Sequence, residues 1–300
     1  MPFLPRPVRD ALDLAGVRSR VVRHPDVTLL SHPAGPPSAR AVLGELGSGL
    51  AAGRLLGALP RLSSAPRGDG HTVVDIPGWK APELSGAPLR AYLRTLGYDA
   101  QGWGLGTNTG DPRRDVGRLT RRVLELVELD GSPVSLVGWS LGGVLAREVA
   151  RRRPDAVRRV ITYGTPVVGG PRFTAVARAY GGEASVAADA VARRLDAGSP
   201  IQVPLHVLFS RRDGIVSWQA CLDRSSPYAE HLEVSSTHIG MGVDPDVWRL
   251  VAERLALGTG LRGEAGTSGS VDWVPDRVSR ASPRPHVSRL QASGPPRDPR

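Results

Sequence analysis

Ser140 is the residue that most clearly predicts chemistry, because it lies between Gly138 and Gly142 in the pattern G-x-S-x-G. The apolar run Val134 to Val137 leads into this pattern, and a helix-forming stretch follows from Leu141. A strand-turn-helix context of this kind holds a serine hydroxyl clear of a sheet, at a helix N-terminus that favours developing negative charge. The plainer alternative is a serine helix cap preceded by a packing glycine. The flanking strand and helix favour a nucleophile.

A serine hydroxyl is a weak nucleophile unless a base accepts its proton. The histidines that follow Ser140 before the C-terminal segment are His206, His231 and His238. His206 lies within the apolar run 203–208 and is expected to pack against a sheet, whereas His231 lies in a polar stretch and is interpreted as a surface residue. His238 lies in a loop just after the last expected strand, where a base could reach the nucleophile. We therefore predict that His238 is the base.

An acid must hold the imidazole in the correct tautomer and stabilise its protonated form. Asp213 is the best candidate, because it follows an expected strand and precedes Gly214. Asp-Gly is also a turn dipeptide, and the two interpretations are compatible. Asp196 and Asp223 are alternatives that are less well placed in the sequence.

The negative oxygen that forms during acyl transfer needs two backbone N–H donors. We expect these from Leu141, which follows the nucleophile, and from Trp79 in a Pro-Gly turn after the first core strand. Lys80 could add a positive charge nearby, or it could be a solvated surface residue. Trp139 and Trp218 are expected near the site, where they would line an acyl pocket or serve as ordinary packing residues.

Segments of strand and helix pattern alternate along the chain and would position these residues. Short connections between them predict an α/β fold with a mainly parallel sheet of about six strands, covered by helices on both faces. The expected strands are 72–76, 98–103, 134–137, 157–163, 203–209 and 232–235. The expected helices outside the N-terminal segment are 88–96, 111–129, 141–153 and 243–257.

The same patterns divide the chain into parts. Residues 1–70 are expected to form a helical segment, interrupted by glycines, that packs on the core. Residues 71–257 form the main domain, and residues 167–200 within it are interpreted as a small cap over the carboxyl edge of the sheet. Residues 258–300 are rich in Gly, Ser, Pro and Arg and are predicted to be disordered.

Composition narrows the classes of function. The 300 residues carry a net charge of +10, but the arginines are scattered and Lys80 is the only lysine, so we expect no nucleic-acid partner. Cys221 is the single cysteine, which excludes an intramolecular disulfide and a cysteine-rich metal site. We expect no metal and no organic cofactor. The sequence carries no signal for oligomeric state.

The sequence also bears on location. The N-terminus has prolines and charges where a signal peptide needs an apolar stretch. No run approaches the roughly 18 apolar residues of a membrane span. We therefore expect a cytoplasmic protein without an integral membrane segment.

Taken together, these residues resemble the lipase and esterase branch of the α/β-hydrolase superfamily, and actinobacterial hydrolases in particular. The resemblance spans about residues 70–257. It rests on a Pro-Gly turn, a Trp-Gly-Leu-Gly segment with a following asparagine, the serine motif, and three later loops. In this chain these are Pro77-Gly78, Trp103 to Gly106 with Asn108, Gly138 to Gly142, Gly164 to Pro166, Asp213 to Val216, and His238 to Met241.

The resemblance implies the α/β-hydrolase fold and hydrolysis of a small-molecule or lipid ester through an acyl-enzyme. Ser140 would attack, His238 would carry the proton and Asp213 would orient the imidazole. Many relatives have His-Gly before the oxyanion residue, whereas this chain has Pro77-Gly78. An acyltransferase that uses the same acyl-enzyme is one alternative, and a non-catalytic binding protein on the same scaffold is another.

Overall fold

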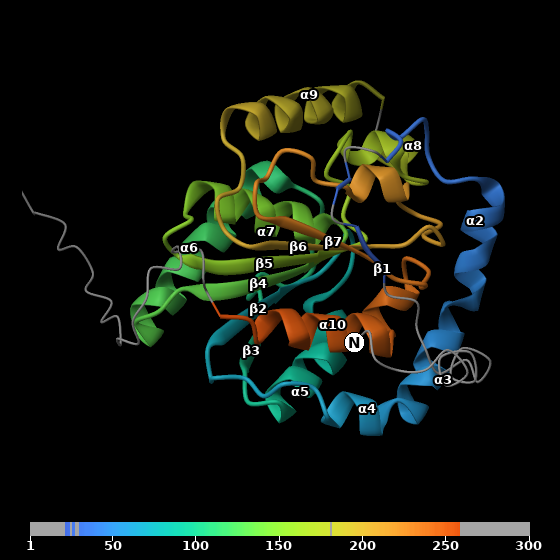
Figure 1. Ribbon diagram of the computed structural model, residues 1–300. Helices are drawn as coiled ribbons and strands as arrows, with labels where there is room; N and C mark the ends of the chain where they lie inside the picture. The colour runs from blue at the N-terminus through green and yellow to red at the C-terminus, as the bar shows by residue number, and fades with distance from the viewer. Residues whose placement is uncertain (1–21, 25, 28–29, 181, 259–300) are drawn as a thin grey trace, which may run out of the picture. The chain divides into compact units, whose positions relative to one another are not determined.

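A central β-sheet organises the part of the chain that the computed structural model describes, residues 22–24, 26–27, 30–180 and 182–258. The strands of this part are β1 (Val22–His24), β2 (Thr72–Ile76), β3 (Asp99–Gly102), β4 (Val134–Trp139), β5 (Val157–Tyr163), β6 (Leu205–Phe209) and β7 (Ala229–Glu233). They form one seven-stranded sheet in the order β1-β7-β6-β5-β4-β2-β3 (Figure 1). All neighbours are parallel except β1 and β7. The predicted α/β architecture with a mainly parallel sheet is therefore confirmed.

The antiparallel edge strand β1 was not expected, since residues 1–70 were interpreted as helical. It pairs through Val22, Arg23 and His24 with the end of β7. The His24 ring also lies 2.9 Å from a carboxylate oxygen of Glu233. A strand of three residues is too short to show the alternation by which strands are recognised in a sequence. Residues 1–21 and the predicted disordered tail beyond residue 258 lie outside the described residues.

Helices cover both faces of the sheet, because the inner strands are apolar on both sides. Helices α6 (Pro112–Asp130) and α7 (Leu141–Arg152) lie on one face, and α5 (Ala87–Thr95) and α10 (Pro245–Leu255) lie on the other (Figure 1). Alternate residues of each strand point to opposite faces. One core cluster contains Leu136, Val160 and Val207, and the other contains their neighbours Val137, Ile161 and Leu208. No helix among the described residues is both long and apolar enough to cross a membrane.

The N-terminal segment contains three short helices, α2 (Ala39–Gly44), α3 (Gly49–Gly57) and α4 (Leu59–Ser63), with the single turn η1 (Glu45–Ser48) between the first two. Two of these helices, α3 and α4, pack on α10. The Arg54 guanidinium donates to Asp244 at 3.2 Å and to Asp246 at 2.8 Å, and Arg61 also pairs with Asp246. Both aspartates are buried at the start of α10. Charged hydrogen bonds therefore attach α3 and α4 to the last helix.

The insertion 167–200 contains η3 (Gly170–Phe173), α8 (Ala177–Tyr180) and α9 (Gly182–Gly198). Asp196 of α9 accepts hydrogen bonds from Arg147 at 3.1 Å and Arg151 at 2.5 Å, both on α7. Thr174 pairs as an isolated bridge with Val216, in the loop after β6. These contacts tie the insertion to α7 and to that loop. Its role as a cap stays a prediction.

His231 is buried in β7, so its interpretation as a surface residue is wrong. Its Nε2 accepts the backbone N–H of Asp223 at 3.1 Å. Burial lowers the pKa of His231 to about 4, although the Asp223 carboxylate opposes this shift. The polar neighbours of His231 in sequence suggested exposure, but β1 on one side and β6 on the other enclose it within the sheet.

The pKa of His231 predicts a stability loss in acid. A histidine whose folded pKa lies below its unfolded value near 6.5 takes up a proton on unfolding, so stability falls as pH drops from about 6.5 towards 4. Integrated to pH 4, this contributes about 3 kcal/mol to the loss. We expect His231→Gln to lose correspondingly less stability than the wild type between pH 7 and pH 4, measured by urea unfolding. The exposed His32→Gln should keep the wild-type loss, and an equal loss in all three proteins would contradict this account.

Candidate active site

Ser140 lies in a sharp bend between β4 and α7. Its φ of 52° and ψ of −121° place it in a left-handed region that a residue with a side chain seldom adopts. The bend is tight enough to require both flanking glycines. A Cβ on Gly138 would lie 2.5 Å from Gly143 Cα, and one on Gly142 would overlap the Ile76 carbonyl oxygen. The local geometry is that of a serine held at the end of a strand and the start of a helix.

Asp213 and His238 form a buried pair. The distance from His238 Nδ1 to Asp213 Oδ2 is 2.8 Å, and both side chains are almost completely buried. The second carboxylate oxygen of Asp213 accepts the backbone N–H groups of Ile215 at 2.9 Å and Val216 at 2.7 Å. Asp213 thus both stabilises the turn of its own loop and forms a hydrogen bond with the His238 imidazole. With Nδ1–H donated to the carboxylate, His238 Nε2 is left as the acceptor.

Gly164, the residue after β5, brings Ser140 and His238 into one neighbourhood. A Cβ on Gly164 would lie 2.9 Å from His238 Nδ1, and its φ is 60°. The preceding carbonyl, on Tyr163, accepts the Ser140 backbone N–H at 2.9 Å. The Trp139 ring, next to the serine, lies 5.5 Å from the His238 ring between centroids. Among the described residues no hydrogen bond joins the Ser140 hydroxyl to His238; such bonds often tighten only when substrate binds.

The alternative acids, Asp196 and Asp223, pair with arginines of α7. Burial alone would raise the pKa of Asp223, but the Arg147 guanidinium and Ser226 hold it well below its ordinary value. Asp196 pairs with Arg147 and Arg151, as described above. Neither aspartate forms a hydrogen bond with His238 in the described part of the chain.

His206, like the alternative acids, forms contacts of its own within the fold. His206 is buried in β6, and its Nδ1 lies 2.9 Å from a Glu230 carboxylate oxygen. It therefore packs within the sheet, as its apolar neighbours indicated.

The described part of the chain contains no cluster of His, Cys, Asp and Glu side chains that could hold a metal ion.

The turn that carries Trp79 packs against the serine bend. A Cβ on Gly78 would lie 3.3 Å from Ser140 Cβ. The buried Asn108 fixes this turn from behind, since its side-chain amide donates to the Pro77 carbonyl at 2.8 Å and its own carbonyl accepts the Lys80 N–H at 2.7 Å. Trp79 is thus near the start of α7, where Leu141 lies. Their roles as oxyanion donors stay predictions.

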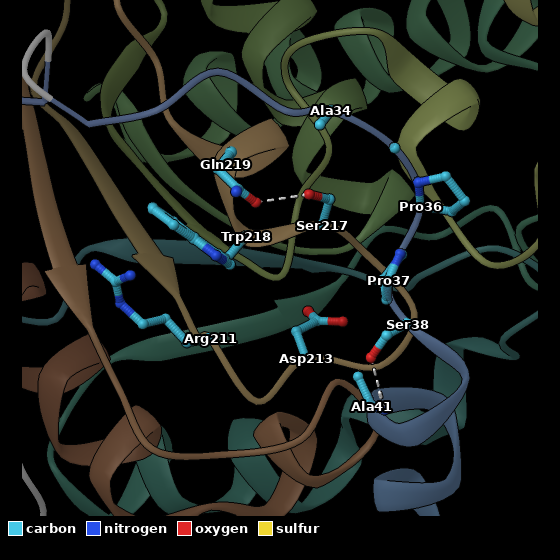
Figure 2. A pocket seen from close by; sticks show the side chains of 11 residues that line it. Ala34, Pro36, Pro37, Ser38, Ala41, Arg211, Asp213, Ser217, Trp218 and Gln219 are labelled. Atoms are coloured by element: carbon cyan, nitrogen blue, oxygen red, sulfur yellow. Dashed lines mark hydrogen bonds between the residues drawn. The ribbon is translucent and has the colours of Figure 1, made fainter.

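The two predicted pocket tryptophans have different surroundings. Trp139 lies beside His238, whereas the Trp218 ring stacks on Phe209 with 5.8 Å between centroids. Arg211 covers the Trp218 ring at 4.1 Å. Trp218 and Asp213 line a cavity of about 270 Å³, which residues 34–38 and 41 also line (Figure 2). Ser140 and His238 do not line this cavity, so it borders the acid but not the serine or the histidine.

Glu45 is a residue of this region that the sequence did not reveal. Its carboxylate accepts the backbone N–H groups of Gly214 and His238 at 2.8 Å each, and that of Ile239 at 3.0 Å. It belongs to the N-terminal segment, outside every motif described above. No pattern of residue types in its neighbourhood could have indicated these contacts.

Comparisons with known proteins agree with this architecture. No family model matches the chain. Among solved structures, the mature form of lipase BlEst2 from Bacillus licheniformis matches with a TM-score of 0.50 and 18% identity, over 64% of this chain and 94% of that chain. The α/β-hydrolase enzyme MGS-MChE2, from the metagenome of sediments from the lagoon of Mar Chica, Morocco, matches with a TM-score of 0.45 and 19% identity, over 63% of this chain and 91% of that chain. The closer resemblance to actinobacterial hydrolases stays a prediction. By its sheet order, flanking helices and likeness to BlEst2, the chain has the α/β-hydrolase fold.

Proposed function

We propose that this protein is a serine hydrolase that cleaves carboxylic esters through an acyl-enzyme. The observation that carries the proposal is the bend at Ser140, where a positive φ is retained next to a buried aspartate-histidine pair. A binding protein on this scaffold would need neither the strained serine nor the buried pair. BlEst2, which shares the fold, is described as a lipase, and this agrees with an ester as the substrate class.

The proposed first step is attack of Ser140 Oγ on the ester carbonyl carbon. His238 Nε2 takes the hydroxyl proton, and the negative oxygen of the tetrahedral intermediate accepts N–H groups of Leu141 and Trp79. His238 then donates that proton to the leaving alcohol, which departs as the acyl-enzyme forms. Asp213 stays ionised throughout and stabilises the imidazolium through Nδ1–H.

In the second step, His238 acts as a base towards water and then as an acid towards Ser140. A water molecule loses its proton to His238 Nε2 and attacks the acyl carbon, and the imidazolium returns the proton to Ser140 Oγ as the carboxylic acid leaves. The helix that begins at Leu141 adds the positive end of its dipole at the point where negative charge develops. Small-molecule and lipid esters both fit this chemistry.

Replacing Ser140 by alanine removes the nucleophile. We expect the wild type to react with a fluorophosphonate probe and to hydrolyse p-nitrophenyl esters, and Ser140→Ala to do neither. Mass spectrometry of the labelled protein should place the adduct on the peptide that contains Ser140. The exposed Ser85→Ala is a matched control and should behave as the wild type.

Two results bear directly on this assignment. Labelling that persists in Ser140→Ala would refute Ser140 as the nucleophile. Product analysis with and without an added alcohol or amine measures how the acyl group divides between water and another acceptor. We expect the free acid to predominate, and transfer as the main outcome would make the protein an acyltransferase.

Gly164→Ala tests the imidazole position. Its Cβ would press on His238 Nδ1, at 2.9 Å, and a displacement of the base by about 1 Å can lower kcat by about 100-fold. Gly131→Ala is the matched control, because Gly131 has a φ of 68° and no atom within 4 Å of a new Cβ. Both variants should lose about 1–2 kcal/mol of stability from left-handed strain, but only Gly164→Ala should lose activity. Equal rates in the two folded variants would show that Gly164 does not border the working base.

A further inference from the structure

We propose that Glu45 is a positioning residue that holds the acid loop and the base loop of the active site in register. This inference rests on the proposed function. The loop after β6 carries Asp213, and the loop after β7 carries His238. Glu45 comes from neither loop, but from the single turn η1 in the N-terminal segment.

One carboxylate oxygen of Glu45 bridges the two loops. Its Oε1 accepts the N–H of Gly214, next to the acid, and the N–H of His238, each at 2.8 Å. Its Oε2 accepts the N–H of Ile239 at 3.0 Å. Hydrogen bonds to a carboxylate are shorter than neutral ones and about twice as strong. Because two amides share a single oxygen, their separation is restricted.

No arginine or lysine forms an ion pair with Glu45 in the described residues, and the one side chain that donates to its carboxylate is Ser48, whose hydroxyl lies 3.3 Å from Oε2. Three of the four hydrogen bonds to its carboxylate in this part of the chain thus come from backbone amides of the two loops. A surface glutamate would instead face solvent, and a structural one would pair with a cation. The pattern resembles that of Asp213, whose Oδ1 also binds two amides of its own loop.

Other contacts fit the N-terminal segment to the same two loops. Ser48 Oγ lies 2.8 Å from Thr237 Oγ1, and it donates to the Glu45 carbonyl at 2.6 Å. On the acid side, a Cβ on Gly214 would overlap the Ala41 carbonyl oxygen. The backbone of α2 therefore packs directly on the residue after Asp213, and only glycine allows this approach.

The need for such a residue follows from the geometry of the pair. Asp213 and His238 meet through one hydrogen bond of 2.8 Å, although they lie on different loops. Proton transfer depends steeply on that alignment, so a small relative movement of the loops lowers the rate of the chemical step. The bonds of Glu45 to these loops go to backbone amides and not to the Asp213 carboxylate or the His238 ring, so it acts through the backbone of the two loops.

The experiment compares Glu45→Ala and Glu45→Gln with the exposed Glu128→Ala, which removes the same charge from α6. Steady-state kinetics with a short p-nitrophenyl ester should show kcat lowered by about 10- to 100-fold in Glu45→Ala, with KM changed by less than about twofold. Glu45→Gln keeps one acceptor oxygen and should fall between alanine and wild type. Glu128→Ala should match the wild type.

A second measurement tests the hydrogen bond between His238 and Asp213 directly. The proton that His238 Nδ1 donates to Asp213 should give a far-downfield proton NMR signal in the wild type and in Glu128→Ala. We expect this signal to broaden or disappear in Glu45→Ala, while the rest of the spectrum stays that of a folded protein. A variant that is merely less stable would unfold at a lower temperature but keep the signal below it.

The outcomes separate the two proposals. Unchanged kcat and an unchanged signal in folded Glu45→Ala would overturn the role of Glu45. Should Glu45→Ala fail to fold, Glu45→Gln decides in its place, and wild-type kcat with a wild-type signal there would likewise overturn it. If the wild type neither turns over esters nor reacts with the probe, the proposed function fails; loss of the downfield signal in Glu45→Ala would still support the positioning role.

Discussion

The left-handed backbone at Ser140 is the constraint on which the rest of the site depends. A non-glycine residue in such a conformation costs on the order of 1–3 kcal/mol and persists only where its surroundings enforce it. Here β4 lies within the sheet between β2 and β5, and α7 packs on the same strands, so the chain has to turn within one residue. The close approach of Gly142 to the Ile76 carbonyl shows how little room the turn has. The strain is offset by burial of β4 and α7 in the core.

The helix that follows the serine is held at its far end by buried charge. Arg147 pairs with Asp223, in the segment between β6 and β7, and with Asp196 of the insertion. Arg151, one turn further along α7, donates to Asp196 and to the Leu195 carbonyl. Removing one partner of a buried ion pair is costly, because the other charge is left without compensation. The start of α7 is thus fixed by sterics at the serine bend, and its end by ion pairs.

The features of the fold and site that could be predicted from sequence are those determined by residues close together in the chain. Strands β2 and β5 have the bounds that were predicted from sequence, and the serine bend follows from glycines close to it in the chain. Burial of His231 was missed because it comes from strands on either side, one of which, β1, is too short to recognise. Glu45 was missed for a similar reason. Its partners lie 169 to 194 positions away, and they are backbone amides, which carry no side-chain signature.

Backbone amides, in place of cations, satisfy the carboxylates around the base, and this has a consequence for the proposed mechanism. In the described residues no arginine or lysine pairs with Asp213 or Glu45. A cation beside either carboxylate would compete with the imidazolium for its charge and would raise the free energy of proton transfer. Amide donors hold the carboxylates in place without adding a full positive charge. In the proposed mechanism, the charge that forms on His238 when Ser140 gives up its proton would therefore meet a site that is negative and already oriented, without reorganisation of the fold.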